Sequence, residues 1–188
     1  MNALWRRLDR PGHDAAFLRP DGDGWRLSGA AVFAHDEGPA ALSYAVEVDR
    51  NWAARRGIVR GFVGRGVVDH EILRGPDGWR LNGVPIADLG HLADLDLSFT
   101  PATSALALRR VAPAVGETVS LPAAWFDLDA ARLAELPQIY ERLSATEYRY
   151  AAPSVPYEAV LDFTPDGFVK TYPGLWRLEA NFDGEASA

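Results

Sequence analysis

The chain has 188 residues, of which 48% are apolar and 24% charged, so it is long enough to form one globular domain with a substantial core. Its net charge of −7 argues against binding to nucleic acid and against electrostatic docking on anionic lipid, since both require a basic surface. The absence of cysteine excludes disulfides and thiolate chemistry. We expect a single domain over residues 1–188, with a frayed tail at 181–188.

The first residues of the chain lack the apolar core of a signal peptide. No window approaches the roughly 20 apolar residues of a membrane-spanning helix. We therefore expect a cytoplasmic protein without a membrane span.

The first half of the chain is predicted to consist of short strands joined by turns rich in glycine and aspartate. Alternation is clearest at residues 41–49, where Tyr44 lies on the apolar face. Further strands are expected at 25–33, 55–63 and 67–73. Short strands at this spacing are typical of an antiparallel sheet.

The centre of the chain, residues 94–111, concentrates polar side chains with defined directions. Asp94 and Asp96 alternate with leucines, which predicts a half-buried strand. The strand breaks at Thr100-Pro101, because proline has no amide hydrogen for a sheet ladder. We expect a hydroxyl of Thr100 or Thr103 to bond to the main chain at this kink.

Alternation resumes after the kink and predicts a second strand that ends at Arg109 and Arg110. Adjacent residues of a strand point to opposite faces, so the two arginines should have different roles. We expect Arg110 to point inward with the leucines, where it pairs with Asp94 or Asp96 or holds an anionic head group. Arg109 is expected on the opposite face with Ala105 and Ala107, which is either exposed to solvent or covered by another strand.

The second half of the chain is predicted to contain a strand at 119–126, a helix at 127–136 with Asp127 as its cap, and one strand within 139–150. Residues 157–163 and 168–172 predict a hairpin. About ten short strands indicate a mainly β fold. We expect a single-domain curved antiparallel sheet or half-barrel with one to three short helices.

The central stretch also resembles a known signature. Thr100-Pro-Ala-Thr-Ser-x-Leu-x-Leu-Arg-Arg110 is similar to the TP-x-TN-x-LPIRR wording of the bacterial "putative glycolipid-binding" family, a domain of unknown function. Other matching segments follow in order from about residue 5 to residue 176, among them Asp9-Arg-Pro-Gly-His-Asp14, Gln138-x-Tyr140 and Tyr172-Pro-Gly-Leu-Trp176. Ser104 replaces the usual asparagine. The resemblance implies a fold similar to lipoprotein localisation carriers and to a violacein-biosynthesis enzyme.

Signatures of common catalytic and metal sites are missing from the sequence. It has no nucleophile elbow, phosphate-binding loop or zinc-protease motif, and its four histidines are scattered. We therefore expect neither a metal nor a cofactor. Asp94 and Asp96 share a strand face, which suits a cation site, an acid/base pair or a simple ion pair with the arginines.

Two functions are compatible with these observations. The first, implied by the resemblance, is binding of a lipid-like or amphipathic small molecule in the concave face of the sheet, where aromatic rings would contact its apolar and hydroxylated parts. The second is a cofactor-free enzyme that acts on a small aromatic or amphipathic substrate in the same cavity. A scaffold for protein interactions is a third reading.

The candidate ligand-binding residues are polar or aromatic and lie on predicted strands or at the kink. Arg55 is suited either to clamp an anion or to pair with Asp49. Each aromatic residue is equally suited to closing the core of a β-barrel. The full set is Arg110, Arg109, Thr100, Thr103, Asp96, Tyr44, Trp52, Arg55, Tyr140, Tyr150 and Tyr172.

Overall fold

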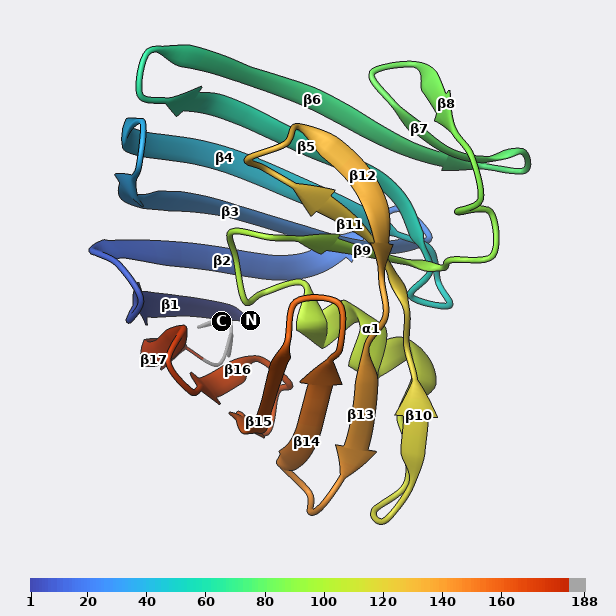
Figure 1. Cartoon of the computed structure of the whole chain (residues 1–188). Helices are drawn as coiled ribbons and strands as arrows, with labels where there is room; N and C mark the ends of the chain where they lie inside the picture. The colour runs from blue at the N-terminus through green and yellow to red at the C-terminus, as the bar shows by residue number, and fades with distance from the viewer. Residues whose placement is uncertain (183–188) are drawn as a thin grey trace.

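A computed structural model describes residues 1–182, and Figure 1 shows one large antiparallel sheet that curves without closing into a barrel. This confirms the predicted mainly β, curved antiparallel fold. The residues at 183–188 lie outside the described part, as does most of the predicted tail. In spatial order the strands are β10 (Thr118–Ser120), β13 (Ile139–Arg142), β14 (Glu147–Ala152), β15 (Tyr157–Phe163), β16 (Val169–Tyr172), β17 (Trp176–Phe182), β1 (Asn2–Arg7), β2 (Gly12–Asp21), β3 (Gly24–His35), β4 (Gly38–Val48), β5 (Ala54–Val63), β6 (Gly66–Gly75), β7 (Gly78–Leu81) and β8 (Val84–Ile86).

A second, small sheet lies against the inner face of this large sheet. It contains β12 (Arg132–Leu136), β11 (Ala123–Asp127) and β9 (Asp94–Leu97), and β9 pairs with β11 in parallel. Figure 1 shows it in front of β3 to β6, beside the helix α1 (Ser104–Val111). Gly57 on β5 permits close contact with this sheet, because a Cβ there would lie 2.4 Å from Leu95 Cδ2.

The main core fills the space between the two sheets. Strand alternation directs Val46, Val59 and Ile72 inward from the large sheet, where they meet Leu97 and Phe126 from the small one. A second buried cluster, which includes Tyr140, Tyr148 and Tyr150, lies under β13 to β16. The inner face of the large sheet is therefore covered by the protein's own side chains.

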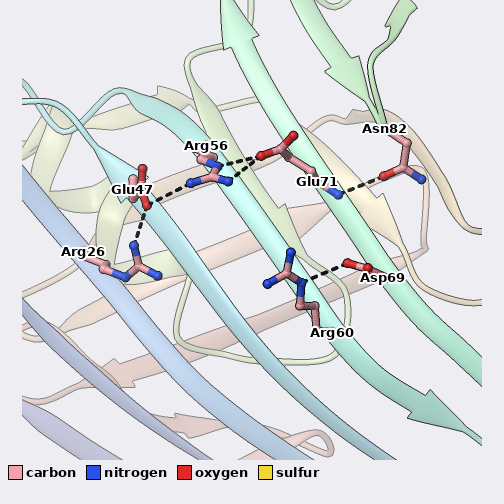
Figure 2. Close-up of polar contacts among 7 residues, drawn as sticks. All are labelled: Arg26, Glu47, Arg56, Arg60, Asp69, Glu71 and Asn82. Carbon is pink, nitrogen blue, oxygen red and sulfur yellow. Dashed lines mark hydrogen bonds and ion pairs between the residues drawn. The ribbon is translucent and has the colours of Figure 1, made fainter.

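Charged residues cross the outer face of the large sheet in a ladder that Figure 2 shows. Arg26 on β3 donates to Glu47 on β4, Glu47 also pairs with Arg56 on β5, and Arg56 donates from Nε to Glu71 on β6 at 2.9 Å. Arg60 and Asp69 form a separate pair between β5 and β6. These cross-strand ion pairs identify the outer face of the strands as the face in contact with solvent.

Three local predictions are wrong. Residues 139–150 form two paired strands, β13 and β14, instead of one. Residues 104–111 form α1 instead of a strand, because the run Ala-Leu-Ala-Leu-Arg-Arg is made of strong helix formers and its alternating pattern is also compatible with a helix buried on most sides. Residues 127–136 form a hairpin between β11 and β12 instead of a helix, with a turn at Ala131 where φ is +47°.

Candidate functional site

A cleft of about 180 Å³ opens where the end of β9 and the start of α1 meet the strands β14 to β17. We call it the tyrosine cleft. One side carries polar groups and the other aromatic rings. Its lining residues are Asp96, Leu97, Ser98, Thr100, Ser104, Trp125, Leu136, Tyr150, Val155, Tyr172, Leu175 and Trp176. A neighbouring cleft of about 230 Å³, lined in part by Arg7 and Arg10, shares Ser98 and Trp125 with it.

Asp96 supplies the carboxylate of the tyrosine cleft. Gln138 donates from Nε2 to Asp96 Oδ2 at 3.2 Å and to the Tyr150 hydroxyl at 3.3 Å, so the buried amide links acid and phenol. Burial raises the pKa of Asp96 to about 6, against the lowering effect of the Gln138 hydrogen bond. Within residues 1–182, Asp96 forms no salt bridge. The charge of its carboxylate is thus not neutralised by a salt bridge with any described residue.

A second carboxylate lies beneath Thr100. Asp14 on β2 has no exposed surface, and it accepts from Thr100 Oγ1 at 2.5 Å and from the Tyr44 hydroxyl at 2.9 Å. Burial raises the pKa of Asp14 to about 7, although both hydroxyl hydrogen bonds lower it. Thr100 Oγ1 also accepts from the Ala102 amide at 3.1 Å, which confirms the expected bond between a kink hydroxyl and the main chain.

Gly29 makes this hydrogen-bond network possible. Tyr44 lies on β4 and Asp14 on β2, so the phenol must reach across β3, and Gly29 is the β3 residue paired with Tyr44. A Cβ at Gly29 would lie 2.3 Å from the Tyr44 hydroxyl. Only a residue without a side chain leaves this path open.

Aromatic rings form the opposite wall of the tyrosine cleft. The ring centroids of Tyr150 and Tyr172 are 5.8 Å apart, and Tyr140 packs behind them with its centroid 4.8 Å from that of Tyr150. Burial raises the pKa of all three phenols, so they are neutral hydrogen-bonding groups at physiological pH. This wall combines apolar ring faces with hydroxyl groups.

Arg110 forms the predicted ion pair next to this site. Its Nε and Nη2 donate to the two oxygens of Asp94 at 2.9 and 2.6 Å, in the two-pronged geometry typical of arginine and carboxylate. Asp94 is buried and the guanidinium is partly exposed. The pair joins α1 to β9 and leaves Asp96 as the unpaired acid of the two.

The remaining candidate residues lie outside the tyrosine cleft. Trp52 stacks on Trp25 with centroids 4.9 Å apart. Arg55 is exposed and pairs with Asp23 instead of Asp49, so that predicted alternative is wrong. Thr103 is buried, and its hydroxyl has no hydrogen-bond partner among the described residues.

Arg109 lies on α1 and not on a strand, so the predicted strand face does not exist. It is half-buried on the other side of α1, where its guanidinium lies 5.3 Å from the Trp52 ring and donates to the Asp166 carbonyl. Residues of a helix follow each other at about 100°, so Arg109 and Arg110 diverge without one of them facing solvent.

Sequence reasoning missed several residues of the site. Asp14 shares its strand face with the buried residues Ala16 and Leu18, so an acid on an inward-facing position was a signal present in the sequence. Strand alternation does not distinguish a buried amide, so the signal for Gln138 in the sequence was the family-like segment Gln138-x-Tyr140. Ser104, Trp125 and Trp176 enter the site only through the tertiary fold.

Metal and membrane features are not found in the described part of the chain. Over residues 1–182, no three His, Asp or Glu side chains cluster as metal ligands do. No helix in that range combines the length and the apolar character that crossing a bilayer requires.

Comparison with known proteins gives one family and one similar structure. A family model described as "Putative glycolipid-binding" matches residues 2–178. No curated protein matches the chain. A crystal structure of a DUF1089 family protein from Pseudomonas aeruginosa is similar, with a TM-score of 0.75 and 25% sequence identity over 87% of this chain and 91% of that one.

Proposed function

The chain belongs to the family described as "Putative glycolipid-binding", and from this premise we propose that it binds an amphipathic, hydroxylated small molecule of the glycolipid type in the tyrosine cleft. The observation that carries the proposal is the composition of that cleft, which is lined by an acid without a salt bridge, five hydroxyl side chains (two of them tyrosines) and several aromatic rings.

The packing of the two sheets supports the tyrosine cleft as the place where a ligand binds. The concave face, where the sequence suggested a binding surface, is covered by β9, β11, β12 and α1. A ligand therefore needs an opening at the border of these elements, and the tyrosine cleft lies at that border.

The chemistry of the cleft suits a sugar-like head group. The Asp96 carboxylate is suited to accept hydrogen bonds from two adjacent hydroxyls of a bound sugar, and charged acceptors form the stronger hydrogen bonds. The aromatic lining residues, among them Tyr172, are of the kind that contacts the C–H side of a sugar. At about 180 Å³ the cleft is smaller than the roughly 300–1,000 Å³ of drug-sized sites, so it would hold the head group and leave the chain outside.

Binding of octyl glucoside, kept below its micelle-forming concentration, tests the proposal by isothermal titration calorimetry. Asp96→Asn should weaken binding about tenfold, because one charge-assisted hydrogen bond contributes about 1.5–3 kcal/mol. Thr171→Ala, an exposed position beside Tyr172 and outside the cleft, is the control and should bind like wild type. Equal affinities for all three proteins, or no binding by wild type, would refute the proposed site.

A cofactor-free enzyme is the second candidate, and the pKa of Asp96 favours it. A carboxyl group with a pKa of about 6, linked through Gln138 to the Tyr150 phenol, is suited to take or give a proton near neutral pH. If the glycoside is consumed on incubation, the rate should depend on a group of pKa near 6, and Asp96→Asn should remove that dependence. An unchanged glycoside after incubation, seen by mass spectrometry, would leave binding as the function.

A further inference from the structure

A second cleft, of about 200 Å³, lies on the other side of α1, between the end of that helix and the turn that joins β15 to β16. We call it the arginine cleft. Its walls include Leu108, Tyr148 and Phe163, and two guanidinium groups, those of Arg109 and Arg142, line it. Among its lining residues, all of them in the described part of the chain, there is no aspartate or glutamate.

Arg142 is fixed in place without being neutralised. Its Nε donates to the Ser144 carbonyl at 3.0 Å, Nη1 to the Pro113 carbonyl at 2.8 Å and Nη2 to the Ala145 carbonyl at 3.0 Å. The guanidinium also lies 5.6 Å from the centroid of the Tyr148 ring. These partners are neutral, so the arginine keeps its full charge in a single orientation.

Arg109 is held in a similar way. Its Nη2 donates to the Asp166 carbonyl and to Met1 Sδ, and its guanidinium lies over Trp52. Burial lowers the pKa of Arg109, and the Asp166 carboxylate raises it by a smaller effect without forming a salt bridge. With residues 1–182, Nε and Nη1 of Arg109 form no hydrogen bond, so these donors are free for a ligand.

Arg110 differs from Arg109 and Arg142 because it has a carboxylate partner. Arg110, the next residue of the same helix, is neutralised by both oxygens of Asp94. The chain has 26 acidic and 19 basic residues, so carboxylates are in excess, yet none forms a salt bridge with Arg109 or Arg142 across the described residues. Two charges held half-buried without a salt bridge call for a ligand that supplies one.

We propose that the arginine cleft binds a tetrahedral oxyanion, such as the phosphate of a phosphate ester. Guanidinium groups match the spacing of phosphate oxygens, and apolar walls such as Leu108 and Phe163 lower the local dielectric and strengthen the contact. The volume admits a phosphate and the first atoms of its ester. The oxyanion is either free phosphate or the head group of a phospholipid.

The site is independent of the proposed function, because no residue lines both the arginine cleft and the tyrosine cleft. Octyl glucoside carries no charge and should not respond to changes in the arginine cleft. Loss of either binding activity can therefore be attributed to its own cleft.

Titration of the intact protein with inorganic phosphate, at constant ionic strength set by sodium chloride, tests the proposal through the resonances of the arginine Nε–H groups. Phosphate should shift the Nε–H resonances of Arg109 and Arg142. Arg109→Gln should weaken phosphate binding about tenfold or more, by loss of one charge-assisted contact. Arg177→Gln removes the same charge from an exposed position on β17 and should bind like wild type.

A second variant covers the case in which Arg109→Gln does not fold. Ala112, exposed at the end of α1 with φ +46°, lines the arginine cleft, and aspartate tolerates this backbone conformation. The carboxylate of Ala112→Asp would lie in the arginine cleft and pair with its guanidinium groups, so this variant should bind phosphate more weakly than wild type.

Dihexanoyl phosphatidic acid, titrated in the same way, distinguishes the source. Tighter binding than phosphate identifies a lipid head group, and equal or weaker binding identifies free phosphate. No shift of either resonance at millimolar phosphate, or equal affinities for Ala112→Asp and Arg177→Gln, would overturn the proposal.

Discussion

Asp14 is a carboxylic acid with no exposed surface whose side-chain hydrogen bonds come from two neutral hydroxyls, those of Thr100 and Tyr44. A buried carboxylate without a cation costs free energy that hydroxyl donors offset only in part. The folded protein therefore binds the proton of Asp14 more tightly than the unfolded chain does, and this couples stability to pH.

The free energy of unfolding should fall as pH rises from about 4 to about 7 because of Asp14. In this window the folded state keeps the proton, since its pKa is about 7, while the unfolded state, with a pKa near 3.8, has lost it. The loss is up to about 4 kcal/mol, since each pKa unit corresponds to about 1.4 kcal/mol. Above pH 7 the contribution of Asp14 is constant.

Urea unfolding of wild type and Asp14→Asn at pH 5 and pH 8 measures this effect. The stability of Asp14→Asn relative to wild type should rise between the two pH values, because the amide does not ionise. Asp21→Asn, an exposed position on the same strand, should show no such change. The interpretation fails if all three proteins have the same pH dependence.

At the same scale, the sequence predicted the partner of Arg110 but not the environment of Arg109. The partner could be predicted because a guanidinium near buried residues needs a carboxylate, and Asp94 was the nearest choice along with Asp96. The environment of Arg109 depends on Met1, Trp52 and Asp166, which are far away in the sequence. No periodicity within residues 94–111 contains that information.

At the scale of elements, strands were easier to predict than the small sheet and the helix. Long strands with one solvated face, such as β4, alternate clearly because water and core lie on opposite sides. The helix α1 is buried along residues 104–108, so its apolar run fits either a helix or a strand. In β12, Leu133 and Leu136 have a spacing that is also typical of a helix. The turn at Ala131, where φ is positive, is what makes this segment a hairpin with β11 and not a helix.

The path of Tyr44 across β3 gives a prediction at this scale. Gly29→Ala should destabilise the protein by about 1–3 kcal/mol, because the new methyl group forces the phenol away from Asp14 and breaks its hydrogen bond. The φ angle of Gly29 is not in the left-handed region, so the effect is steric. Thermal unfolding of the variant provides the measurement.

Gly75→Ala is the matched control for this change. Gly75 ends β6, and a Cβ there meets no atom within 4 Å. Its stability should stay within about 0.5 kcal/mol of wild type, as for most surface substitutions. Equal melting temperatures for the two variants would show that Tyr44 adapts without loss.

At the scale of the whole molecule, the sequence predicted the curved antiparallel sheet but not where a ligand could lie. The tyrosine cleft combines Asp96 from β9, Tyr150 from β14, and Tyr172 from β16. Their meeting depends on how the small sheet fills the curve of the large one. The sequence of a single strand predicts which of its faces is buried, whereas a cleft is formed by the packing of several layers.

The position of β1 in the large sheet has a consequence for how the protein folds. β1 pairs with β2 on one side and with β17 on the other, from Asn2–Phe182 to Arg7–Trp176 with a register shift between Leu4 and Trp5. During synthesis, the hairpins from β2 to β8 can form early because their strands are close in sequence. The pairing of β1 with β17 can form only after β17 is synthesised, some 170 residues after β1. Until then β1 carries an unpaired edge in the middle of the future sheet, the kind of edge that invites pairing with another chain. The risk of aggregation should therefore be highest in nascent chains that stop short of β17.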